Sequence, residues 1–93
     1  MYEIDYLLKY VSNDTFKKIT KKSNYILEKL HTNYIDTNLN IRYLIKYGIT
    51  NIDKVIYNMI EEIAINHNEF IKIIKNYEKT LTKDEIIILL ENQ

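Results

Sequence analysis

The chain has 93 residues, and its 13 lysine and arginine residues balance 13 aspartate and glutamate residues to a formal net charge of zero. This balance gives no global electrostatic indication of nucleic-acid binding or of an acidic substrate. The absence of cysteine excludes a disulfide, a thiolate zinc site and a cysteine nucleophile.

The composition favours an all-α fold. There is no proline and only one glycine, so most turn and hairpin signals are missing. Hydrophobic residues make up 46% of the chain, which is typical of a folded domain of this size. We therefore predict a compact bundle of five or six short helices, forming a single domain over residues 1–93. No signal peptide or membrane-length apolar run is visible in the sequence, so a cytoplasmic location is expected.

The first predicted helix covers residues 2–11. One stripe, spaced as on a single helix face, contains Ile4, Leu7, Leu8 and Val11. A second stripe beside it contains Tyr2, Tyr6 and Tyr10. Two interpretations of these tyrosines stay open: rings at the edge of the core with hydroxyls in water, or an aromatic contact surface for a partner.

The second predicted helix covers residues 14–31. Its expected buried stripe contains Phe16, Ile19, Ser23, Ile26, Leu27 and Leu30. Its first half carries a lysine cluster, namely Lys17, Lys18, Lys21 and Lys22. Cations near a helix N-terminus are mildly unfavourable. Because runs of like charge usually form a solvated face, the cluster is interpreted mainly in that way. The functional alternative is a patch that binds phosphates or an acidic partner.

A loop is predicted over residues 32–37, anchored by Tyr34 and Ile35. The next helix, over residues 38–47, would bury Ile41, Leu44 and Ile45 and end at Gly48, the only glycine. Thr50 is the predicted cap of a further helix that begins at residue 51. Its apolar face contains Ile52, Val55, Ile56, Met59, Ile60 and Ile63. Because an unbroken helix over residues 51–80 would be about 45 Å long, we favour a break near residues 66–68, with Asn68 as cap.

The last helix has the clearest start signal, a capping box formed by Thr82 and Glu85. Five consecutive apolar residues follow, namely Ile86, Ile87, Ile88, Leu89 and Leu90. Five in a row cover the whole circumference of a helix. The helix is therefore either buried on all sides or leaves part of its surface for another chain.

The segment around Gly48 resembles a helix-turn-helix motif. Gly48, Ile49 and Thr50 occupy the place of that family's turn, between two predicted helices. The pattern departs from the family at Lys54, where a buried apolar residue is usual. If the resemblance held, it would imply a nucleic-acid-binding regulator, with Arg42 and the lysine cluster as contacts.

No catalytic, cofactor or metal site is legible in the sequence. Glu28 and His31 form half of a di-iron pattern, but the second half and the further glutamates are missing. His31 is better explained at a helix C-terminus, and His67 as a satisfied core or kink residue. We therefore expect no enzymatic activity, no cofactor and no metal.

The most economical hypothesis is a non-enzymatic protein that binds another protein, as inhibitors, adaptors and immunity proteins do. The expected contacts are the run from Ile86 to Leu90 together with the three tyrosines, and a homodimer is a further possibility. Heavy use of isoleucine, asparagine, lysine and tyrosine indicates A/T-rich codons, which fits low-GC bacteria, their phages and some large DNA viruses, so a viral or phage gene is one expectation. The alternative hypothesis is the nucleic-acid-binding regulator.

Overall fold

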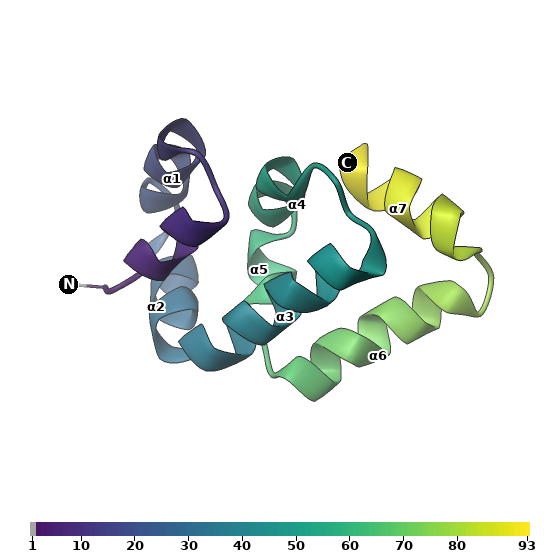
Figure 1. Cartoon of the computed structure of the whole chain (residues 1–93). Coiled ribbons are helices and arrows are strands. Elements are labelled where there is room, and N and C mark those ends of the chain that lie inside the picture. Colours follow the sequence, from purple (N-terminus) through teal and green to yellow (C-terminus); the bar gives the residue numbers. More distant parts are fainter. Residues whose placement is uncertain (1) are drawn as a thin grey trace.

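The computed structural model describes residues 2–93, which form seven α-helices and one 3₁₀ helix (Figure 1). In chain order these are η1 (Asp5–Lys9), α1 (Asn13–Thr20), α2 (Asn24–Thr32), α3 (Tyr34–Tyr47), α4 (Ile52–Asn58), α5 (Ile60–Ile63), α6 (His67–Glu78) and α7 (Lys83–Glu91). The predicted all-α bundle is confirmed, with more and shorter helices than the five or six expected.

The longest helix, α3, is the centre of the bundle. It packs against α2, α4, α5 and α6, and its Ile41 and Leu44 are completely buried. The helices surround one core, with a radius of gyration of 12.8 Å and principal extents of 40 × 25 × 20 Å. Figure 1 shows α1 and α2 at one end of the long axis and α7 at the other.

The first helix is shorter than predicted and of the 3₁₀ type. Leu7 is completely buried and Ile4 nearly so, whereas Leu8, which was predicted to share their stripe, is 42% exposed. A 3₁₀ helix has three residues per turn, so residues 4 and 7 stack on one side and residue 8 turns away. The prediction for Leu8 was therefore wrong because it assumed α-helical spacing.

The predicted helix over residues 14–31 is two helices. Ser23, placed on the buried stripe by the sequence pattern, is exposed and caps α2, with its Oγ accepting the backbone N–H of Ile26 at 3.4 Å. Ser12 caps α1 in the same way through the N–H of Thr15. A serine with extended backbone angles starts a new helix here and does not continue the old one.

The predicted loop over residues 32–37 is wrong, because α3 already begins at Tyr34. The N–H and Oγ1 of Thr37 both donate to the carbonyl of Asn33, at 2.8 Å each. Asn38 similarly donates to the carbonyl of Tyr34. These polar side chains bond to the preceding turn, so they fit within a helix although they resemble loop residues.

Gly48 ends α3 as predicted, with φ of 118°. The N–H of Ile49 donates to the carbonyl of Leu44 at 3.1 Å and that of Gly48 to the carbonyl of Ile45, which is the bonding pattern of a Schellman motif. Ile49 is buried, as its position after the turn predicts. Ile45, expected in the core, is instead 44% exposed.

Asn51 caps α4, not Thr50, and its side chain accepts the N–H of Lys54 at 3.3 Å. Thr50 has another role: its N–H and hydroxyl both donate to the Glu91 carboxylate, at 2.8 and 3.0 Å. The N–H of Asn51 donates to the same oxygen at 3.2 Å. The end of α7 thereby caps the start of α4, an interaction between positions 40 and 41 residues apart in the chain.

The predicted break before residue 68 is confirmed, although its cap is Asn66 and not Asn68. Asn66 accepts the N–H groups of Asn68 and Glu69, at 2.9 and 3.4 Å. A second, unpredicted break lies at Met59, which separates α4 from α5. With these two breaks the chain can fold back on α3 and need not run as one long rod.

Polar residues in α3, and the one just before it, hold the turn between α5 and α6. Asn40 is completely buried, and its Nδ2 donates to the carbonyls of Ile63 and Ile65, at 2.9 Å each. One and two turns earlier, the carboxylate of Asp36 accepts the N–H of His67, and Asn33 donates to the carbonyl of Ala64. These bonds satisfy backbone groups that the irregular turn leaves unpaired.

Candidate protein-interaction surfaces

The apolar run of α7 is divided between the core and the surface. Ile86 and Leu90 are completely buried, and Ile87 is half-buried. Ile88 is 61% exposed and Leu89 is 39% exposed. Ile86 and Leu90 are therefore committed to this chain's own core, and only the exposed side of α7 is left for a partner.

The predicted capping box positions this helix. The N–H of Glu85 donates to Oγ1 of Thr82 at 3.2 Å, and the N–H of Thr82 donates to the Glu85 carboxylate at 2.9 Å. The bond from the Thr82 N–H to the carboxylate lowers the pKa of Glu85 below its ordinary value. Asp84 precedes Ile88 by one turn, and Glu85 precedes Leu89 by one turn. The exposed side of α7 is thus acidic at its start and apolar at its end.

The three tyrosines of the N-terminal segment are used inside the molecule. The hydroxyl of Tyr6 donates to the carbonyl of Leu30 at 2.6 Å, and that of Tyr10 donates to Oδ1 of Asn38 at 2.7 Å. Burial raises the pKa of Tyr6 to about 12, so the hydroxyl remains a donor. The Tyr2 ring packs on His31, with 6.1 Å between ring centroids.

The expectation of hydroxyls in water is therefore corrected for Tyr6 and Tyr10, because both hydroxyls have partners in α2 and α3. Figure 1 also shows η1 and α7 at opposite ends of the molecule. The structure does not bring the tyrosines and the apolar run of α7 into one surface.

The lysine cluster is divided as well. Lys18 and Lys22 lie over the ring of Tyr57, with Nζ 5.9 and 4.5 Å from its centroid. Lys17 on α1 and Lys21, which follows the helix directly, are exposed. Arg42 is exposed on α3, which is not one of the helices that α1 mainly contacts, because α1 packs on η1 and α4. Two of the four lysines thus have cation–π partners within the chain.

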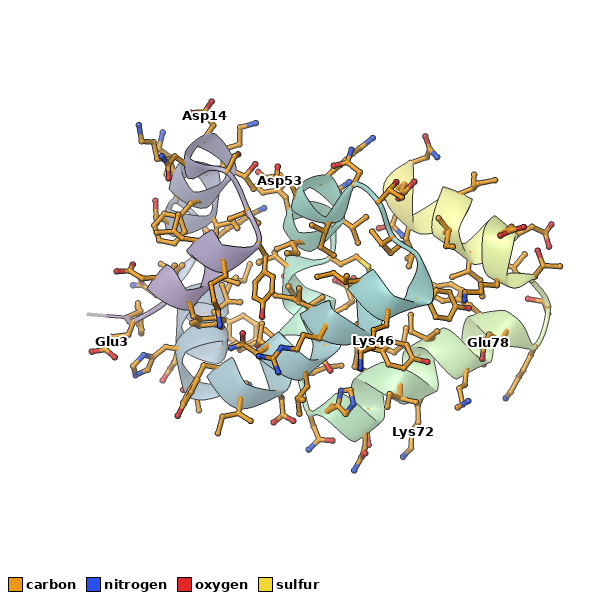
Figure 2. All side chains as sticks on the ribbon, viewed as in Figure 1. Glu3, Asp14, Lys46, Asp53, Lys72 and Glu78 are labelled. Carbon is orange, nitrogen blue, oxygen red and sulfur yellow. The ribbon has the colours of Figure 1, made fainter. Side chains whose placement is uncertain are left out.

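The helix-turn-helix alternative depends on α4, which Figure 1 shows between α1 and α7. Asp53, near the start of α4, accepts the N–H of Ser12 and the hydroxyl of Thr15, at 2.6 Å each, and Figure 2 shows it between α1 and α4. Glu91 takes the donors just before α4. A recognition helix needs an accessible N-terminal end with hydrogen-bond donors for DNA. In this fold the N-terminal end of α4 is occupied by the contacts of Asp53 and Glu91 with other parts of the same chain.

A second candidate surface, which the sequence reading missed, is the outer side of α3. Ile35 is 61% exposed and Leu39 is 39% exposed, one helical turn apart. Arg42 and Lys46 continue the same stripe at the spacing i, i+4, i+7, i+11 and are both exposed. The spacing of these four residues could have predicted the face. It did not, because residues 32–37 were predicted to be a loop, which left Ile35 outside the helix.

The two histidines have structural partners. Nδ1 of His31 accepts the N–H of Glu3 at 3.0 Å, and Nδ1 of His67 lies 2.7 Å from Oδ1 of Asn40.

A cleft of about 800 Å³ near the N-terminus is lined by Glu3, Asp5, Tyr6, His31, Thr32 and Tyr34. In residues 2–93 no three histidine, aspartate or glutamate side chains are grouped so that they could hold a metal ion.

Comparison of the chain with protein-family models, with curated proteins and with solved structures found no significant match. Within residues 2–93, no helix combines the length and the apolar character that crossing a bilayer requires.

Proposed function

We propose that this protein is non-enzymatic and acts by binding another protein through its exposed apolar helix surfaces. Two such surfaces are defined. The α3 face consists of Ile35, Leu39, Arg42 and Lys46, and the α7 face consists of Asp84, Glu85, Ile88 and Leu89.

One observation carries the proposal. Of the eight large hydrophobic side chains that are exposed in residues 2–93, four belong to these two faces, as neighbouring pairs. Apolar side chains scattered singly over a surface are normal, whereas adjacent ones beside charged residues are typical of interaction sites. Fully burying an exposed isoleucine or leucine side chain contributes roughly 1.5–3 kcal/mol, and each pair could supply part of that because its members are 39% and 61% exposed.

The rest of the fold suits this role. The core, the capping box and the polar contacts of α3 place both faces on helices that are fixed within the bundle. A binding surface that is already rigid loses less conformational entropy when a partner binds. Inhibitors, adaptors and immunity proteins need such a surface, and the A/T-rich codon usage is compatible with a viral or phage gene as well as with one from a low-GC bacterium.

The test is a capture experiment from the native host with four forms of the chain. Leu39→Glu alters the α3 face, Ile88→Glu alters the α7 face, and Tyr25→Glu is the matched control. Tyr25 is 64% exposed on α2 and belongs to neither face. Circular dichroism would first establish that all four forms are helical to the same degree.

We expect a partner that is retained by the wild type and by Tyr25→Glu but lost, or weakened at least tenfold, by Leu39→Glu or Ile88→Glu. A partner that both face variants retain at full affinity would refute the proposal. The absence of any protein bound by the wild type above background would also refute it.

A further inference from the structure

We propose that the α3 face binds the α7 face of a second copy of this chain, with the two helices antiparallel. This inference rests on the proposed function, because it assigns a partner to both surfaces defined above.

The order of residues along the two helices is complementary. From N- to C-terminus the α3 face presents its apolar pair and then its two cations, Arg42 and Lys46. The α7 face presents its acidic pair first and then its apolar pair. Only an antiparallel arrangement places apolar residues opposite apolar residues and, at the same time, carboxylates opposite cations.

The charges at this contact are free to pair. The single salt bridge within residues 2–93 joins Lys72 to Glu69, so neither Arg42 nor Lys46 is neutralised by a salt bridge there. On α7, Glu85 is already engaged with Thr82, which leaves Asp84 as the main acceptor for a cation. An arginine or lysine that meets a carboxylate in the partly desolvated contact would add specificity and orientation.

The dimensions of the two faces also match. Along α3 the centres of the apolar and basic pairs are seven residues apart, or about 10 Å, and along α7 the corresponding centres are four residues apart, or about 6 Å. The long, flexible side chains of Arg42 and Lys46 can span the difference of about 4–5 Å. Antiparallel packing also brings together opposite ends of the two helix dipoles.

The contact is heterologous, since it joins different surfaces of the two copies. Each copy then still has one unused face, so association continues head to tail unless two such contacts close a pair. Association should therefore depend on concentration, and it should weaken with salt because exposed charges contribute to it.

Sedimentation velocity of two charge-reversed variants tests the inference. One variant is Arg42→Glu with Lys46→Glu, which makes the α3 face acidic. The other is Asp84→Lys, which makes the α7 face more basic. The matched control is Lys75→Glu, at an exposed position of α6 outside both faces. Concentrations should extend to about 1 mM, where contacts of a few kcal/mol are populated.

We expect the wild type and Lys75→Glu to associate, and each charge-reversed variant to associate at least tenfold more weakly. Mixing the two variants in equal amounts should restore association. The acidic α3 face of one variant then meets the lysine introduced at position 84 of the other, while the unchanged faces remain complementary. A folding defect in either variant could not produce this rescue.

A wild type that remains monomeric up to the highest concentration would overturn the inference, and so would a mixture that fails to associate. The proposed function could be judged separately. If the monomeric wild type still captured a partner that Leu39→Glu loses, binding through the α3 face would stand and only its assignment to a second copy would fall.

Discussion

Oδ1 of Asn40 lies 2.7 Å from Nδ1 of His67, and the same asparagine donates from Nδ2 to two backbone carbonyls. Because the Nδ2 bonds orient the amide, Oδ1 must accept, and His67 must carry its proton on Nδ1. One completely buried side chain on α3 thus fixes both the turn after α5 and the first residue of α6. The orientation of α6 depends on this polar contact as well as on apolar packing.

Replacing Asn40 with alanine should lower the free energy of unfolding by about 2–4 kcal/mol, because the carbonyls of Ile63 and Ile65 lose their donor in a buried site. Urea titration followed by circular dichroism measures this change. Asn76→Ala, at an exposed position of α6, is the matched control and should change stability by less than about 1 kcal/mol. Equal losses in the two variants would contradict the role given to Asn40.

Replacing Gly48 with alanine should cost about 1–2 kcal/mol, since a side chain at φ of 118° is strained. A Cβ there would also lie 3.0 Å from Cδ1 of Ile87, the end of a flexible side chain. Thermal unfolding of Gly48→Ala, Ile87→Val and the double variant separates the two effects. We expect most of the loss to persist with Ile87→Val, because the backbone strain does not depend on that contact. Full recovery in the double variant would show that the backbone contributes little.

Acidification should remove stability contributed by Asp53. Partial burial, the largest single influence, opposes ionisation, but the hydrogen bonds from Thr15 and Ser12 together with the charge of Lys18 outweigh it and lower the pKa of Asp53. A carboxyl group with a lower pKa in the folded state stabilises the protein above its ordinary pKa of 3.8. That contribution is lost as the pH falls through the lower, folded value.

Asp53→Asn should therefore cost about 1 kcal/mol at neutral pH, and the difference from the wild type should shrink as the pH approaches and passes below the ordinary carboxyl range. Chemical denaturation at a series of pH values measures the difference. Glu28→Gln, at an exposed position within α2, is the control. A gap between Asp53→Asn and wild type that stays constant at every pH would rule out the ionised hydrogen-bonded carboxylate as its cause.

The features that the sequence predicted correctly depend on a few neighbouring residues. The Gly48 turn needs only a residue that tolerates positive φ, and the capping box of Thr82 and Glu85 closes within four positions. The all-α class followed from the absence of proline and the scarcity of glycine. For α7, the sequence predicted the helix itself but left open whether its apolar run is buried on all sides.

The features that the sequence could not predict depend on residues far apart in the chain. Asn33 and Asp36 resemble loop residues, yet they lie in and beside a helix because their side chains bind the turn around Ala64 and His67. Likewise, Glu91 caps a helix that begins 39 residues earlier, at Ile52.

Local pattern by itself determined the helical class, the sharp end of α3 and the start of α7, because each is decided by backbone geometry and hydrogen bonds within one or two turns. Only the tertiary structure decided that Ile86 and Leu90 are buried while Ile88 and Leu89 stay exposed, and that α3 has an outer face. The physical reason is that exposure depends on which neighbouring helices cover a side, and long-range polar contacts such as that between Asn40 and His67 place those helices.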